Sequence, residues 1–331
     1  MKNFAAHTAY LWIIRVVAAL GVGISVVAAA LSGSMLVHGH PAYLILLVLI
    51  FVVSAVILAR GWPRRLQQRL LPAAPARLAR RRAHRLARRL ARGILVAASA
   101  VMIASVVWLV PSTADAPAIT AMRSDNAVMV AETPTEIVLT PTAATDAVGV
   151  FFQPGARVDA RAYTAILRPL ASAGHLVVIT KQPLGIAFLA TGAFAAARAM
   201  HHPVTRWVLG GHSLGGLIAA TDAENFAAAA ENPVVGLFFF ASYPATDLSK
   251  LTIAVLSISG SNDGLSTPGK VANAKPLLPS STRYLVIRGG THSYFGDYGA
   301  QSGDGTPAVS RDRARAQISD ASVAFVTGIT N

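Results

Sequence analysis

The sequence contains no cysteine among its 331 residues. A disulfide-stapled scaffold, a zinc-finger array and a thiol enzyme are therefore excluded. Charged residues are also scarce, at 13% of the chain, whereas hydrophobic residues make up 53%. Because intrinsic disorder requires low hydrophobicity, a disordered chain is excluded as well.

Acidic residues are missing from the first third of the chain. Residues 1–110 carry 14 Lys and Arg and no Asp or Glu, whereas residues 111–331 contain as many acidic as basic residues. The formal net charge of +14 therefore belongs entirely to the first third. The remaining 221 residues are enough for one domain with its own core. Two different kinds of protein are joined near Pro111.

Three long apolar runs fill most of the first third. They cover about residues 10–31, 42–59 and 93–110, and only the first contains a charge, Arg15. Each has the length of a helix that crosses the hydrocarbon core of a membrane, and in lipid only a helix satisfies its own backbone over that length. We therefore predict a three-span membrane anchor over residues 1–110. The alternatives are buried helices of a soluble protein and, for the first run, a cleaved signal peptide.

Twelve arginines lie between the second and third runs, in residues 60–92. Because positive residues in short loops stay on the cytoplasmic side, this loop predicts a cytoplasmic N-terminus and an extracytoplasmic location for everything after Pro111. The expected location is the cell membrane, with the lipid bilayer as a partner. Leucines at helical spacing among the arginines are also typical of an amphipathic helix on anionic lipid. Nucleic acid is the alternative partner of this loop, but aromatic residues are not interleaved with the arginines, so we expect none to bind.

After a linker over residues 111–124, short apolar strands alternate with helices to the end of the chain. Such alternation predicts an α/β domain over residues 125–331, with a doubly wound, mostly parallel sheet covered by helices on both faces. Reactive groups in such sheets gather beyond the carboxyl ends of the strands. The strands are expected at residues 127–131, 136–140, 148–152, 175–180, 206–209, 234–240, 253–259 and 283–288, and the helices at 160–173, 185–200, 214–230 and 306–327.

A G-x-S-x-G pattern lies between an apolar strand and an alanine-rich helix, as Gly211-His212-Ser213-Leu214-Gly215. In that context the pattern predicts a nucleophile elbow, a strained turn in which only small residues fit on either side of the serine. The N-terminus of the following helix favours negative charge developing at the serine. Ser213 is therefore the candidate nucleophile, and a glycine-rich turn with an idle serine is the alternative.

A serine nucleophile needs a base, and the base needs an orienting acid, in the chain order Ser, Asp or Glu, His. His292 is the only histidine after Ser213, and it lies just beyond the last expected strand. Asp263 follows the strand expected at residues 253–259, so its carboxylate would emerge at the same edge of the sheet. Asp247, which follows the preceding strand, is the alternative acid.

The negative oxygen that forms during attack needs two backbone N–H donors. One donor should be Leu214, the residue after the nucleophile. The other should come from the loop after the strand at residues 148–152. Because Pro154 has no N–H, Ala156 or Gly155 must donate, and we expect Ala156.

At these residues the second domain resembles the compact bacterial α/β-hydrolases. Five strings carry the resemblance in the family's order, over about residues 125–331: FQPGARVD (152–159), TKQPL (180–184), GGHSLGG (210–216), GSNDG (260–264) and GTHSYFGDYG (290–299). The apolar runs lie outside the resemblance. Two residues depart from the pattern: Ala156 stands where a second glycine is usual, and Gln182 stands where many relatives have methionine.

The resemblance implies two-step acyl transfer by Ser213, His292 and Asp263, with Leu214 and Ala156 holding the oxyanion and no metal or organic cofactor. We therefore expect a membrane-anchored serine hydrolase, carboxylesterase- or lipase-like, that cleaves an ester-type bond of an acyl substrate. The alternatives are amide, thioester or lactone cleavage by the same residues, and a non-catalytic binding domain on a hydrolase fold. The segment 241–252 is too short for a lid domain, which predicts a fairly open site.

Overall fold

The computed structural model describes residues 2–59, 75–143 and 145–330. Contacts within it divide the chain into two units, which we call the helical unit and the sheet unit. The helical unit comprises Met1–Gly33 and Leu44–Val110, and the sheet unit comprises Ser34–Tyr43 and Pro111–Asn331. Residues 60–74 of the expected arginine-rich loop lie outside the described residues.

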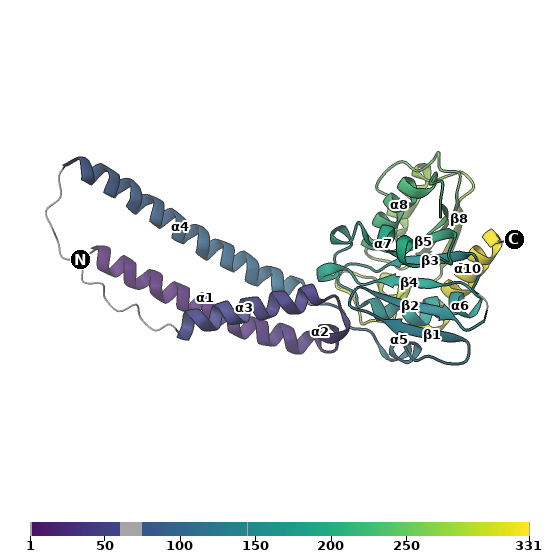
Figure 1. Ribbon diagram of the computed structural model, residues 1–331, viewed down its shortest axis with the longest axis horizontal. Helices are drawn as coiled ribbons and strands as arrows, with labels where there is room; N and C mark the ends of the chain where they lie inside the picture. The colour runs from purple at the N-terminus through teal and green to yellow at the C-terminus, as the bar shows by residue number, and fades with distance from the viewer. Residues whose placement is uncertain (1, 60–74, 144, 331) are drawn as a thin grey trace. The chain divides into compact units, whose positions relative to one another are not determined.

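Three long helices dominate the helical unit: α1 (Lys2–Ser32), α3 (Pro41–Ala59) and α4 (Pro75–Trp108) (Figure 1). Each contains a stretch that is long and apolar enough to cross a membrane, namely Trp12–Ser32, Pro41–Ala59 and Leu90–Trp108. These stretches coincide with the three apolar runs of the sequence. From Pro75 onward, the basic segment before the third stretch is part of helix α4. We had expected a loop or a separate surface helix there.

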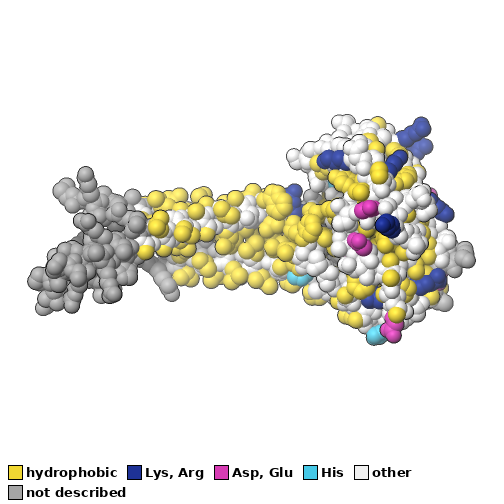
Figure 2. Space-filling view, turned by 90° about the horizontal axis from the view of Figure 1, so that it is seen from above, with side chains coloured by type: hydrophobic (Ala, Val, Ile, Leu, Met, Phe, Trp, Pro, Cys, Tyr) yellow, Lys and Arg dark blue, Asp and Glu magenta, His cyan; other side chains and the backbone are white. Residues whose placement is uncertain are grey.

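Hydrophobic side chains cover the outward faces of these helices (Figure 2). Leu31, Ile94 and Val101 are 62%, 69% and 66% exposed. Soluble proteins rarely expose contiguous apolar surface on this scale, whereas hydrocarbon is the natural surrounding of such a surface. The exposed faces therefore agree with the composition of membrane-spanning helices.

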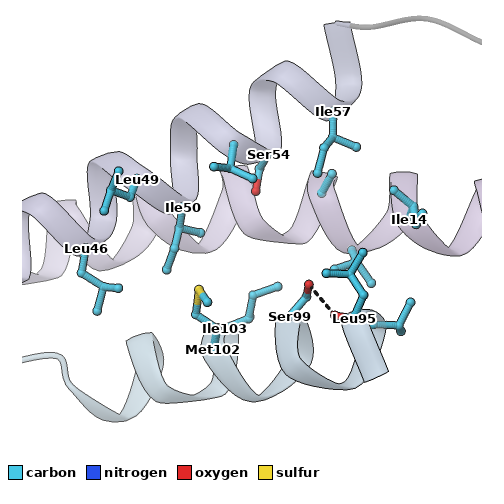
Figure 3. Close-up of a pocket in the computed structure, with 14 residues that line it drawn as sticks. Ile14, Leu46, Leu49, Ile50, Ser54, Ile57, Leu95, Ser99, Met102 and Ile103 are labelled. Atoms are coloured by element: carbon cyan, nitrogen blue, oxygen red, sulfur yellow. Dashed lines mark hydrogen bonds between the residues drawn. The ribbon is translucent and has the colours of Figure 1, made fainter. Parts of the chain in front are cut away.

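A cavity of about 650 Å³ lies between α1, α3 and α4 (Figure 3). Its lining is apolar except for Ser54 and Ser99, and the Ser99 hydroxyl donates to the Leu95 carbonyl at 2.9 Å. Next to it α1 and α3 approach closely, because a Cβ at Gly21 would lie 2.3 Å from Ser54 Oγ. Small residues at such crossings are typical of packed helices in membranes.

The sheet unit contains one eight-stranded sheet, in the order β1-β2-β4-β3-β5-β6-β7-β8. β1 pairs antiparallel with β2 and β2 with β4, whereas all the other pairs are parallel. The mostly parallel sheet is as predicted. The strands are β1 (Val128–Glu132), β2 (Glu136–Pro141), β3 (Val148–Gln153), β4 (Val177–Thr180), β5 (Arg206–His212), β6 (Val234–Phe240), β7 (Ala254–Gly260) and β8 (Arg283–Ile287).

Helices cover both faces of this sheet (Figure 1). They are α5 (Ala116–Ala121), α6 (Thr164–Ser172), α7 (Ala193–Met200), α8 (Leu214–Phe226), α9 (Pro268–Asn273) and α10 (Arg311–Thr330). Successive residues of a strand point to opposite faces, so Phe152 packs in one core with α6 and α10, and Phe151 packs in the other with α7 and α8. β3 is buried on both faces, as its continuous apolar run predicts.

Several segments differ from the expected elements, including α9, which was not predicted. Within the helix predicted at residues 185–200, only α7 is α-helical. Ala187–Leu189 form a short 3-10 helix, and Gly185 has a φ of 66°, which no α-helix contains. The predicted linker, residues 111–124, is also more structured than expected. It contains α5, and Ser112 forms a parallel bridge with Val158, next to the loop that follows β3.

Packing around Gly210, in the middle of the sheet, leads to a testable prediction. A Cβ at Gly210 would lie 2.1 Å from the buried ring of Phe238, which is itself packed against Phe152 and Phe240. We expect Gly210→Ala to cost about 1–3 kcal/mol through overpacking and to lower the midpoint of thermal unfolding by several degrees.

Gly192→Ala is the matched control, because nothing lies within 4 Å of a Cβ at Gly192 and its backbone is right-handed. Differential scanning fluorimetry of the detergent-solubilised full chain measures both variants. If Gly210→Ala unfolds at the same temperature as Gly192→Ala, the Phe238 ring moves aside freely and this account of the packing is wrong.

Candidate active site

Ser213 occupies the turn between β5, which ends at His212, and α8, which begins at Leu214. Its backbone has φ 52° and ψ −123°, in the left-handed half of conformational space that residues with a Cβ avoid. The flanking glycines are required by close approach of the main chain: a Cβ at Gly211 would lie 2.5 Å from Gly215, and one at Gly215 would lie 2.1 Å from the Gln153 carbonyl oxygen. The G-x-S-x-G string therefore forms a strained, tightly packed turn.

Asp263 and His292 come together beyond the ends of β7 and β8. Asp263 Oδ2 lies 2.9 Å from His292 Nδ1, and both residues are buried. The other carboxylate oxygen, Oδ1, accepts from the N–H groups of Leu265 and Ser266 at 2.8 and 2.7 Å. The alternative acid, Asp247, is exposed and accepts from the N–H of Ser249. The structure thus brings Asp263, and not Asp247, to the candidate base.

The second ring nitrogen of His292 is an unpartnered polar atom in a buried site. Nε2 has no hydrogen-bond partner in the described part of the chain. When Nδ1–H of the neutral ring donates a hydrogen bond to the Asp263 carboxylate, the ring carries its lone pair on Nε2. That atom is therefore in the form that takes a proton from a nucleophile.

The sequence left Gly155 and Ala156 as alternative N–H donors in the loop after β3, and their hydrogen bonds in the structure differ. Gly155 N–H donates to the hydroxyl of Tyr163 at 2.9 Å, so it is already engaged. Ala156 N–H has no acceptor among the residues that the structure describes. Leu214 is the first residue of α8, where N–H groups have no acceptor within the helix. The backbone leaves Ala156 and Leu214 available as donors.

Tyr163 and His212 form a buried pair that the sequence did not reveal. The Tyr163 hydroxyl lies 2.8 Å from His212 Nδ1, and the His212 ring packs against the His292 ring with centroids 4.6 Å apart. Burial raises the pKa of Tyr163 and lowers the pKa of His212, so both are neutral near pH 7. His212 is visible in the sequence beside the serine, but Tyr163 has no local signal and is identified only through its contacts.

Gln182 explains one departure from the family pattern. Its amide Nε2 donates to Gln153 Oε1 at 3.1 Å and to the Pro154 carbonyl at 3.0 Å. Both acceptors lie at the start of the loop that carries Ala156. A methionine at this position has no N–H to donate, so in this chain the loop is held by hydrogen bonds that a methionine would not make.

Asp222 lies on α8, about two turns after Ser213, and is only 4% exposed. Its Oδ2 has no hydrogen-bond partner in the described ranges. Burial raises the pKa of Asp222 to about 7, and the neighbouring Gln153 side chain opposes only part of this shift. A group of three or more His, Asp or Glu residues that could hold a metal ion is not found among the described residues.

A family model described as the alpha/beta hydrolase family matches residues 149–316 of this sequence. The matched segment contains Ser213, Asp263 and His292, together with the loop that carries Ala156. No curated protein matches the chain.

Several solved structures are similar to the chain at low identity. The Pyrobaculum calidifontis esterase is 15% identical, with a TM-score of 0.47, over 65% of this chain and 89% of that one. A monoacylglycerol lipase from Paleococcus ferrophilus is 12% identical, with a TM-score of 0.47, over 61% of this chain and 99% of that one. An alpha-beta serine hydrolase homologue from Coxiella burnetii is 13% identical, with a TM-score of 0.43, over 61% of this chain and 98% of that one.

The raised pKa of Asp222 predicts how stability depends on pH. Because the pKa is about 7 in the folded protein and near 3.8 ordinarily, the folded state keeps a proton between these values that the unfolded chain releases. Stability is therefore expected to fall as the pH rises through this window. Asp222→Asn removes the buried charge, so we expect it to raise the unfolding midpoint at pH 8 by several degrees and to have little effect at pH 4.

Thermal unfolding of the full chain at the two pH values measures this difference. Asp247→Asn is the control, because Asp247 is exposed and makes only a local contact with Ser249. An equal gain from Asp222→Asn at both pH values would show that Asp222 does not titrate in this range.

Proposed function

The chain belongs to the alpha/beta hydrolase family, and on that basis we propose that it is a serine hydrolase that cleaves an ester bond. One observation carries the proposal: the hydrogen bond between buried Asp263 and His292, at the same edge of the sheet as the strained Ser213 turn. Each of the three residues follows the end of a parallel strand, which is where reactive groups of such sheets gather.

The proposed reaction is acyl transfer in two steps. Ser213 Oγ attacks the ester carbonyl while His292 Nε2 takes its proton, and Asp263 orients the ring and stabilises the imidazolium. The N–H groups of Leu214 and Ala156 hold the oxyanion, and each such donor is typically worth about 10²–10³ in rate. His292 then returns the proton to the departing alcohol. A water that loses its proton to His292 splits the acyl-enzyme, which releases the acid and regenerates Ser213.

We further propose that the helical unit anchors the protein in the cell membrane and that the sheet unit lies outside the cytoplasm. The guanidinium of Arg92 lies 4.8 Å from the ring centroid of Tyr10. Arg92 lies at the start of the apolar stretch of α4 and Tyr10 just before that of α1, so the two stretches begin at the same end of the helical unit. A first and a third span run in the same direction, and Arg and Tyr are favoured at the membrane interface.

Covalent labelling tests the reaction. We expect a fluorophosphonate probe to label the full-length protein and not Ser213→Ala, because only an activated serine reacts with it. Ser249→Ala, an exposed serine on another loop, is the control and should label like the wild type. Equal labelling of wild type and Ser213→Ala would count decisively against the proposal.

A substrate panel then separates the leaving groups. Rates on matched esters, thioesters, lactones and anilides of short acyl chains are expected to be highest for the esters, and all should be lost in Ser213→Ala. A preference for another leaving group would support a serine hydrolase whose substrate is not an ester. A folded wild type that turns over no small ester and takes no label would indicate a binding domain on a hydrolase fold.

Membrane topology gives a further prediction. A reporter that fluoresces only in the cytoplasm should stay dark when fused after Asn331. The arginine-rich segment should stay on the cytoplasmic side, and one membrane span separates it from the sheet unit. The same reporter fused before Met1 should fluoresce. A bright signal from the fusion after Asn331 would place the sheet unit inside the cell.

A further inference from the structure

Asp304 joins the two loops that carry the candidate acid and base. It lies between the turn that contains His292 and the start of α10. Its Oδ1 accepts from the backbone N–H of His292 at 2.9 Å and from that of Gly264, the residue after Asp263, at 3.2 Å. Its Oδ2 accepts from the N–H of Ser293 at 2.8 Å. One carboxylate thus holds the main chain beside both members of the Asp263–His292 pair.

The backbone of the segment around Asp304 lies in close contact with the backbone of the Asp263 loop. A Cβ at Gly305 would lie 1.8 Å from the Asn262 carbonyl oxygen, and a Cβ at Gly264 would lie 2.5 Å from the Gly303 carbonyl oxygen. Gly303 also has a φ of +84°, which a larger residue rarely adopts. These glycines allow the Asp304 carboxylate to enter the space between the two loops.

The carboxylate is kept ionised by these contacts. Burial raises the pKa of Asp304, but the N–H groups of Ser293, His292, Gly264 and Gly305 outweigh burial and bring the pKa below its usual value. An ionised carboxylate makes stronger hydrogen bonds to N–H groups than a neutral amide oxygen does. Both of its oxygens are occupied by main-chain donors, so Asp304 does not compete with Asp263 for the His292 ring.

We propose that Asp304 is a positioning residue that sets the geometry of the Asp263–His292 pair, an inference that rests on the proposed function. β7 and β8 are neighbours and fix the roots of the two loops, but the hydrogen-bonded side chains lie several residues beyond the strand ends. Asp304 ties His292 and the residue after Asp263 to a single group. A displacement of about 1 Å in such a pair can cost about a hundredfold in rate.

Three substitutions in the full-length protein test the inference. Asp304→Ala removes both acceptors, and we expect kcat to fall about a hundredfold with KM changed less than about twofold, because Asp304 acts through His292 rather than on the substrate. Asp304→Asn keeps one acceptor oxygen and should fall between Asp304→Ala and the wild type. Asp247→Asn makes the same chemical change at an exposed aspartate that also accepts a backbone N–H, and it should match the wild type.

A second measurement reads the pair without any turnover. The proton shared by Asp263 and His292 Nδ1 should give a far-downfield NMR signal, assigned by its loss in Asp263→Asn. We expect Asp304→Asn to shift or broaden this signal and Asp247→Asn to leave it unchanged. The signal, and the fluorimetric unfolding midpoint, also show whether a variant has kept its fold. Asp304→Asn serves as the test if Asp304→Ala does not fold.

The outcomes separate this inference from the proposed function. A wild type without labelling or turnover contradicts the proposed function, whereas the NMR signal still decides whether Asp304 positions the pair. A lower kcat with unchanged KM and a shifted signal in folded Asp304→Asn supports the inference. If folded Asp304→Asn keeps the wild-type signal and kcat, or loses kcat only in proportion to its unfolded fraction, the inference is overturned.

Discussion

The turn between β5 and α8 holds Ser213 at positive φ, and the surrounding main chain leaves no room for a Cβ at the flanking residues Gly211 and Gly215. A residue in such a conformation costs about 1–3 kcal/mol and persists only when its neighbours hold it there. Gly215 lies against the main chain of Gln153, so the same turn brings the loop after β3 next to the N-terminus of α8. The candidate oxyanion donors, Ala156 and Leu214, come from these two segments. The positions of both donors therefore depend on the close contact between Gly215 and Gln153.

Around this turn, buried and half-buried polar groups hold the loops that the sheet alone does not position. Tyr163 joins the loop of Ala156 to His212, Gln182 ties the start of that loop, and Asp304 joins the loops of Asp263 and His292. Tyr163, Gln182 and Asp304 each make hydrogen bonds to main-chain atoms or to another buried side chain, which offsets part of the cost of burying them. Asp222 is also buried, its Oδ2 has no partner among the described residues, and burial raises its pKa.

Local patterns in the sequence predicted a large part of this architecture. The three apolar runs coincide with the apolar stretches of α1, α3 and α4, and the alternation of strands and helices predicted a mostly parallel sheet. Prediction from composition and periodicity was wrong where the backbone adopts a conformation that the composition does not favour. The alanine-rich stretch before residue 200 suggested one helix, but Gly185 takes positive φ, Ala187–Leu189 form a short 3-10 helix, and only α7 is α-helical. Helix α5 in the predicted linker was not predicted, because it is too short to give a periodic signal.

By itself, the sequence determined the alternation of strands and helices, the three apolar helices with basic and no acidic residues around them, and the candidates Ser213 and His292. Each of these depends on residues that are close together in the chain. Only the tertiary structure decided between Asp263 and Asp247, since both follow a strand and only the packing of β7 against β8 brings one of them to the histidine. It alone shows that Asp304 accepts hydrogen bonds from two loops that are far apart in sequence. Local patterns record what one segment prefers, whereas a carboxylate held between two loops is defined by the distances between them.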